Sequence, residues 1–220
     1  IALTLLAPMV QAQVKNTFKP DPRLVKLFRK NFKDAEKQYL FLMKHVPADS
    51  LPNTYEHGKW QNTSASNWVS GFYPGTLFLI YQVTKDPALY NEAVSKLKVL
   101  EPEQTINSHD IGFMMYDSYG VANRLTPDAA YKDVLLTSAK SLAKRFNPVV
   151  GCTMSWGSKP GHFRVIIDNM MNLELLMWAT KTTGDSTFAK IGISHANTTM
   201  KNHFRPDYSS FHLVDYNPET

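Results

Sequence analysis

Two aspartates stand at the start of the most apolar segments of the sequence, where a carboxyl can serve as an acid or a base. Asp168 lies in RVIIDNMMNLELLMWA and Asp110 in NSHDIGFMMYDSYG, and each begins an expected apolar helix after a loop. Two interpretations stay open for both: each carboxylate caps its helix by accepting backbone N–H bonds, or both face one cavity. Apolar neighbours would raise the pKa of Asp168 toward the value that a general acid needs.

Two histidines accompany these acids. His109 directly precedes Asp110, and His212 lies in RPDYSSFHLVDY. A histidine outside a recognisable motif is more often structural than functional, so the sequence leaves both roles open. The seven histidines form no closely spaced cluster such as HExxH, and we therefore expect no bound metal. The sequence also lacks GxSxG, P-loop and GxGxxG motifs, so we expect neither a serine hydrolase nor a nucleotide or other cofactor.

Three aromatic residues are expected in loops near these acids. Trp68 and Tyr73 lie in NWVSGFYPG, and Trp156 lies in SWGSKPG. Such rings either stack on the faces of sugar rings or pack into the protein interior. We predict that all three contribute to a substrate site, with ordinary packing as the alternative.

The segments that must position these side chains are helical. Residues 24–46 place apolar side chains on one stripe and predict a long amphipathic helix. Three passages then share one plan, in which an apolar helix leads through a turn with threonine and aspartate to a more polar helix. We expect the turn acids to cap the second helices; they are Asp86, Asp128 and Asp185.

This repeat predicts an all-α fold in which helical hairpins stack into an α/α toroid or solenoid, with one layer buried and the other half exposed. The alternation alone does not separate a closed ring from an open superhelix. The long loops all precede the apolar helices. We therefore expect these loops at one end of the fold, where a site would form.

The two ends of the sequence predict processing and a longer parent chain. Residues 1–13, IALTLLAPMVQAQ, are apolar, too short to span a bilayer and end near Ala12, as in a truncated signal peptide. A buried N-terminal helix is the alternative; export to the periplasm or the medium is the expectation. The sequence stops in the turn-like VDYNPET, so we expect residues 21–220 to form the N-terminal part of one catalytic domain.

Composition argues against several other classes of protein. The 24 Lys and Arg residues exceed the 19 Asp and Glu residues, but the basic residues are scattered, which argues against nucleic acid as a partner. Cys152 is the single cysteine, so no internal disulfide can form. This argues against a small disulfide-stabilised secreted fold and favours a large domain with its own core.

The motifs together resemble a known family. GFYPG, HDIGF, RVIIDNMMNLELLMWA followed by TGD, and SSFH occur in this order. From about residue 68 onward the chain resembles glycoside hydrolase family 88, the unsaturated glucuronyl hydrolases. The resemblance implies an (α/α)6 barrel, of which about the N-terminal half is present. It also implies an enzyme that removes the unsaturated uronic acid from the non-reducing end of oligosaccharides made by polysaccharide lyases, of glycosaminoglycan or ulvan type.

The resemblance further implies roles for single residues. Asp168 matches the acid that protonates C4 of the uronate double bond and then, as a base, activates the water that attacks C5. Asp110 matches a second essential acid near the uronate hydroxyls. The matches to substrate contacts are His109, His212 and Trp156, with Tyr73 at a position where the family has a stacking tryptophan.

Two other functions also fit these residues. An inverting glycosidase of another α/α-toroid type would use both acids on a saturated sugar. A non-catalytic helical repeat would bind sugars through its aromatic side chains without turnover. We predict hydration of the double bond, which turnover of unsaturated but not of saturated disaccharides would distinguish from both.

Overall fold

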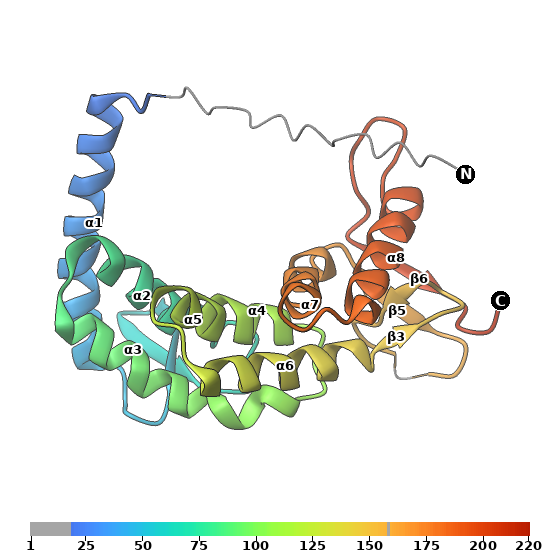
Figure 1. Cartoon of the computed structure of the whole chain (residues 1–220), viewed down its shortest axis with the longest axis horizontal. Coiled ribbons are helices and arrows are strands. Elements are labelled where there is room, and N and C mark those ends of the chain that lie inside the picture. Colours follow the sequence, from blue (N-terminus) through green and yellow to red (C-terminus); the bar gives the residue numbers. More distant parts are fainter. Residues whose placement is uncertain (1–18, 158) are drawn as a thin grey trace, which may run out of the picture.

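The computed structural model describes residues 19–157 and 159–220, so the signal peptide expected at residues 1–13 lies outside the described part. The described chain is mainly helical, and its helical hairpins lie in a row between α1 at one end and α8 with the β5–β6 sheet at the other (Figure 1). The elements in chain order are α1 (Pro22–Leu42), η1 (Met43–His45), β1 (Leu51–Glu56), β2 (Lys59–Thr63), α2 (Phe72–Thr84), α3 (Pro87–Leu100), η2 (Glu101–Thr105), α4 (Ile111–Met115), η3 (Tyr116–Gly120), α5 (Val121–Leu125), α6 (Ala129–Ala143), β3 (Phe146–Asn147), β4 (Cys152–Thr153), β5 (Phe163–Ile166), α7 (Asn169–Thr183), α8 (Ser186–Asn202) and β6 (Leu213–Tyr216).

The helical hairpins have the plan that the sequence predicts. Helix α2 pairs with α3, the segment α4–η3–α5 packs against α6, and α7 pairs with α8. The turn acids Asp86, Asp128 and Asp185 each accept a 2.8 Å hydrogen bond from the backbone N–H two residues later. Each bond satisfies a donor that the first helical turn leaves free, so the prediction of three caps is confirmed.

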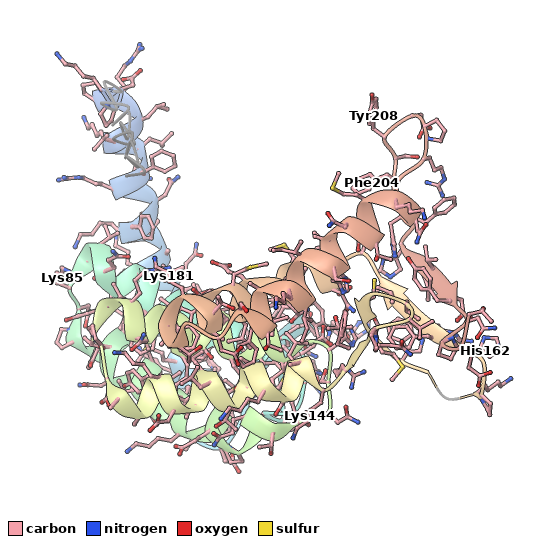
Figure 2. All side chains as sticks on the ribbon, turned by 45° about the vertical axis from the view of Figure 1, so that its right-hand side comes forward. Lys85, Lys144, His162, Lys181, Phe204 and Tyr208 are labelled. Carbon is pink, nitrogen blue, oxygen red and sulfur yellow. The ribbon has the colours of Figure 1, made fainter. Side chains whose placement is uncertain are left out.

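The short turns and the long loops lie at opposite ends of the hairpins. Figure 2 places Lys85 and Lys181, which flank two of the short turns, at one side, and His162, in the loop before β5, at the other. Because the two helices of a hairpin run in opposite directions, α2, α4 and α7 all begin at the end with the long loops. The prediction that the loops gather at one end therefore agrees with the structure.

The two glycines of GFYPG let α2 touch the second hairpin directly. A Cβ atom on Gly71 would lie 2.1 Å from the carbonyl oxygen of Met114, and one on Gly75 would lie 2.0 Å from that of Asp117. Both separations are far shorter than a van der Waals contact, so only glycine fits. The motif is thus explained by close packing of α2 against the backbone of α4 and η3.

The second inner helix is not the single α-helix that its apolar pattern predicts. It consists of α4, the π-helical turn η3 and α5. The hydroxyl of Ser118, inside η3, donates a 2.6 Å hydrogen bond to the carbonyl oxygen of Met114. A serine that bonds back to the preceding turn competes with the regular helical hydrogen bonds, and π-helical turns of this kind often accompany functional sites.

Short antiparallel sheets occupy segments that the sequence pattern assigned to loops. The β1–β2 hairpin turns at His57 (φ 50°) and Gly58 (φ 76°), and both residues adopt the left-handed conformation that a tight hairpin requires. The β6 strand pairs with β5 over its whole length. The prediction that VDYNPET is only a turn is therefore wrong for its first residues, which belong to β6.

Apolar side chains from all the hairpins form the main hydrophobic core, which includes the fully buried Leu77, Leu135 and Leu176. A smaller cluster of Val150, Cys152, Phe163 and Val165 lies beside the strands β3 to β6. No helix in residues 19–157 and 159–220 is both long and apolar enough to cross a lipid bilayer.

A buried lysine ties the loop after α1 to α3. Lys96 is 1% exposed, and its ammonium donates hydrogen bonds to the carbonyl oxygens of Pro47, Ala48 (3.2 Å) and Ser50 (3.0 Å). Glu92, one helical turn earlier, lies 3.7 Å from the same nitrogen. A charge this deeply buried is tolerated because all these oxygens compensate for lost water.

We expect Lys96→Met to lower the free energy of unfolding by about 2–4 kcal/mol, because three backbone carbonyls lose a hydrogen-bond donor in a partly buried contact. Urea denaturation followed by circular dichroism measures this change. Lys98→Met, two residues away on the exposed face of the same helix, is the matched control and should change stability by less than about 0.5 kcal/mol. Equal midpoints for the two variants would contradict the role given to Lys96.

Candidate active site

The two predicted acids meet at the starts of α4 and α7. Asp110, Asp168 and His109 each place one nitrogen or oxygen atom in a group whose members all lie within 4.8 Å of one another. His109 Nε2 is 3.2 Å from Asp110 Oδ1, and both side chains are 13% exposed. The two acids are 58 residues apart in the sequence, and the packing of two hairpins against each other brings them together.

Neither of these aspartates caps its helix with its side chain. The backbone N–H of Asp110 bonds instead to the Ser108 hydroxyl (3.1 Å), which also lies 3.4 Å from Asp110 Oδ2. Asp168 Oδ1 is buried and has no hydrogen-bond partner within residues 19–157 and 159–220. The capping interpretation is therefore wrong for both, in contrast to the three turn acids, and neither carboxyl is engaged in a helix cap.

Two residues in the first turns of the helices hold the acids together. The Asn172 side-chain oxygen accepts a 2.9 Å hydrogen bond from the backbone N–H of Phe113, which joins α7 to α4. A Cβ atom on Gly112 would lie 2.5 Å from the Asn172 Cα atom, so glycine is required for this approach. The contact fixes the start of α4 against α7 and with it the distance between Asp110 and Asp168.

A buried polar network joins the start of α7 to the strands β4 and β5 and the loop between them. Asn169 donates a 2.9 Å hydrogen bond to the Thr153 carbonyl oxygen, and its side-chain oxygen accepts one from the Ser155 hydroxyl at 2.9 Å. Ser155 in turn accepts a 3.0 Å bond from the backbone N–H of Ile166. Sequence reasoning missed Asn169, Asn172 and Ser155. Two buried asparagines in the apolar run DNMMN were the signal that could have revealed them.

Burial raises the pKa of the Asp168 carboxyl above its ordinary value of 3.8. Protonated His109 or His212 would act in the opposite direction and lower this pKa, whereas the negative charge of Asp110 raises it. An unpaired carboxyl with a raised pKa is suited to donate a proton, as the sequence predicts for a general acid.

Burial also raises the pKa of Asp110, while the hydrogen bond from Ser108 and the charge of Arg145 lower it. For His109, burial lowers the pKa, partly offset by the nearby charge of Asp168. Burial thus disfavours the charged form of each of the three groups.

Trp156 and His212 lie on the loops that border this cluster. The Trp156 ring is 5.8 Å from the His109 ring, centroid to centroid, and Trp156 is 39% exposed. The His212 carbonyl oxygen accepts a 2.8 Å bond from the backbone N–H of Ile167, and the charge of the His212 side chain acts on Asp168. Both residues are exposed beside the acids, where the sequence analysis expects them.

Trp68 is 51% exposed, so its ring is accessible to a substrate. Its ring packs edge-on against Phe72 and Phe113, with centroids 5.8 and 6.3 Å away. Phe113 belongs to the first turn of α4 and comes three residues after Asp110. Trp68 therefore extends an aromatic surface outward from the start of the helix that bears one of the two acids.

The prediction that Tyr73 stacks on a substrate ring is wrong for this structure. Tyr73 is 4% exposed, its ring stacks on Tyr39 of α1 at 6.1 Å, and its hydroxyl donates a 3.4 Å bond to Glu92 of α3. Successive residues of a helix point about 100° apart. Because Phe72 faces Trp68 and Phe113, its neighbour Tyr73 is directed toward α1 and α3.

Known proteins are similar to this chain in sequence and in fold. The chain is 37% identical over 224 residues to an unsaturated glucuronyl hydrolase of Formosa agariphila, covering 98% of this chain and 55% of the relative. It is 32% identical over 161 residues to an unsaturated chondroitin disaccharide hydrolase of Streptococcus pneumoniae, covering 70% of this chain and 41% of the relative. A crystal structure of an unsaturated glucuronyl hydrolase specific for heparin superposes with a TM-score of 0.82 and 38% identity, over 86% of this chain and 52% of that chain.

The chain spans about half the length of the relatives that it matches. No family model matches it. The predicted fold class is confirmed as a mainly helical chain that corresponds to about half of an (α/α)6-toroid structure. In sequence and in structure, the chain is homologous over most of its length to the unsaturated glucuronyl hydrolases of glycoside hydrolase family 88.

Proposed function

We propose that the protein removes the unsaturated uronic acid from the non-reducing end of oligosaccharides produced by polysaccharide lyases. The observation that carries this proposal is the Asp168 carboxyl, which has a buried oxygen without a hydrogen-bond partner in the described part of the chain and lies within 4.8 Å of Asp110 and His109. The homology to unsaturated glucuronyl hydrolases supports the same reaction.

In the proposed reaction Asp168 first donates its proton to C4 of the uronate, and the electrons of the C4=C5 double bond form the new C–H bond. Positive charge develops at C5 and is shared by the ring oxygen. Water then attacks C5 while the Asp168 carboxylate takes a proton from that water, which restores the acid. The net change is addition of one water. The resulting hemiketal at C5 opens to a ketone and leaves a hemiacetal at C1. Collapse of this hemiacetal to an aldehyde breaks the C1–O bond and releases the remaining saccharide, which takes up the hydroxyl proton.

The neighbouring side chains have complementary tasks. Asp110, 3.2 Å from His109, would accept hydrogen bonds from sugar hydroxyls beside the reacting carbon. The exposed rings of Trp156 and Trp68 offer flat apolar surfaces on which sugar rings stack, and His212 lies beside Asp168 as a further polar contact. Together these groups would bind the ring and keep C4 close to the Asp168 proton.

The names of the relatives indicate which class of substrate to test. Their names refer to chondroitin disaccharides and to heparin, which supports lyase products of glycosaminoglycan type as substrates of this protein.

The decisive assay offers a matched pair of disaccharides, unsaturated and saturated, to the protein expressed from its complete reading frame. We expect the ultraviolet absorbance of the double bond to decay and the saturated partner to stay intact. Cleavage of the saturated sugar would favour an inverting glycosidase, and binding without turnover would favour a sugar-binding repeat.

We expect the activity to survive prolonged dialysis against a chelator such as EDTA, because proton transfer by Asp168 supplies the chemistry of each step. Initial rates before and after dialysis, measured by the absorbance decay, provide the test. A loss of activity that added Mg²⁺, Ca²⁺ or Zn²⁺ restores would contradict this mechanism for the cluster of His109, Asp110 and Asp168.

We also propose that the protein is exported. The support is the apolar stretch at residues 1–13 with Ala12 near a cleavage position, which lies outside the residues that the structure describes. Mass spectrometry of the mature N-terminus from a periplasmic extract tests it. Cleavage near Ala12 is expected, and an uncleaved protein found only in the cytoplasmic fraction would contradict export.

A further inference from the structure

Arg145, two residues after the end of α6, connects two loops of the candidate site. Its Nη1 atom donates to the carbonyl oxygen of Asn107 at 3.0 Å and also to the side-chain oxygen of the same residue. Its Nε atom donates to the carbonyl oxygen of Met154 (2.8 Å) and its Nη2 atom to that of Ser155 (2.7 Å). One planar guanidinium thus joins the loop before α4 to the loop before β5.

Each of these loops carries a residue of the candidate site directly beside its contact with Arg145. Asn107 is two residues before His109 and three before Asp110, and Ser155 immediately precedes Trp156. By joining these two loops, the guanidinium helps to fix the relative position of the His109 and Trp156 rings, whose centroids are 5.8 Å apart. A lysine could not replace it, because a single ammonium on a flexible chain cannot reach all these oxygens at once.

The charge of Arg145 also distinguishes the two carboxyls. Burial raises the pKa of both carboxyls; at Asp110 the charge of Arg145 opposes this rise, whereas at Asp168 the opposing groups are His109 and His212. The groups that face Asp110 are Ser108 and His109 on its own loop, Arg145 from the end of α6 and Asp168 from the start of α7. Of these, Arg145 is the one with a permanent positive charge, since its guanidinium stays protonated at all relevant pH values.

We propose that Arg145 is a positioning residue that holds the His109–Asp110 loop against the Trp156 loop and brings its permanent positive charge to the Asp110 side of the two carboxyls. This inference rests on the proposed hydration reaction for its kinetic consequences. Its structural part, the joining of two loops, stands on the hydrogen bonds of the described residues. The lowering effect of the Arg145 charge on the pKa of Asp110 supports the placement of that charge beside Asp110.

Two variants separate the two tasks of Arg145. Arg145→Lys keeps the positive charge but loses the fork of hydrogen bonds, and we expect it to reduce kcat/KM roughly tenfold without moving the acidic limb of the pH–rate profile. Arg145→Met removes both, so the acidic limb should also move to higher pH, because protonation of Asp110 is no longer opposed. Lys144→Met, at the adjacent exposed position (Figure 2), is the matched control and should behave like wild type.

A second measurement tests the inference even without turnover. The titration of the Asp110 carboxyl is followed by ¹³C NMR in protein labelled at aspartate carboxyls, with Asp110→Asn to assign the signal. We expect its midpoint to rise in Arg145→Met and to stay unchanged in Arg145→Lys, with circular dichroism confirming that both are folded. If Arg145→Met does not fold, Arg145→Lys still has to show the kinetic loss.

The outcomes distinguish the two proposals. If wild type turns over the unsaturated disaccharide, but both Arg145 variants match it in kcat/KM and in pH profile, the role of Arg145 is overturned and the proposed function stands. If wild type turns over no unsaturated substrate, the proposed function fails. The NMR midpoint of Asp110 in Arg145→Met then decides the role of Arg145, and an unchanged midpoint would overturn it.

Discussion

Asp168→Asn is expected to lower kcat for an unsaturated disaccharide by roughly 10⁴-fold, the upper end of what a positioned acid–base group contributes. Asparagine has nearly the same shape as aspartate, but it can neither donate the proton to C4 nor take one from the attacking water. KM should change little, because the substrate contacts proposed for Trp156 and His212 do not involve the Asp168 side chain. The decay of the double-bond absorbance at substrate saturation measures kcat.

Asp185→Asn is a matched control for this substitution. Asp185 also stands at the start of a helix, but its side chain caps α8 through a 2.8 Å bond from Thr187, and asparagine caps helices equally well. Its kcat should equal that of wild type. Full activity of Asp168→Asn, or equal losses in both variants, would show that Asp168 is not the proton donor.

Asp110→Asn is the second substitution with a large expected effect, a fall in kcat of roughly 10²–10³-fold. This variant should also shift the alkaline limb of the pH–rate profile. The negative charge of Asp110 raises the pKa of Asp168, so its removal lowers that pKa. Asp168 then loses its proton at a lower pH, and the rate should begin to fall earlier as pH rises. kcat measured from pH 4 to pH 9 tests both expectations, and an alkaline limb that moves upward would contradict the assigned coupling.

The helical framework was accessible from the sequence because its signals are local. Apolar periodicity marks the helices, and the Thr–Asp turns mark their starts, so the hairpins and the caps at Asp86, Asp128 and Asp185 are confirmed. The β1–β2 hairpin and the strand β6 were missed, because short polar strands lack the alternating apolar pattern. The π-helical turn, inside which the Ser118 hydroxyl bonds to the Met114 carbonyl oxygen, was missed because apolar periodicity does not distinguish it from an α-helix.

The candidate site was only partly accessible, since most of its geometry depends on contacts between distant segments. Asp110 and Asp168 were identified, but their approach depends on the Gly112–Asn172 contact, which no local pattern reveals. Tyr73 was misplaced because a one-residue step turns a helical side chain by about 100°. Arg145 was not identified at all, because in sequence it is one scattered basic residue among many.

The most direct test of the account is the position at which solvent hydrogen enters the product. The unsaturated disaccharide is turned over in D₂O, quenched early and examined by NMR, with the isolated product incubated alone to correct for exchange beside its carbonyl group. Donation of the Asp168 proton to C4 predicts one deuterium on C4, on one face, for each saccharide released. Release of the saccharide with the double bond intact and no deuterium at C4 would contradict the account.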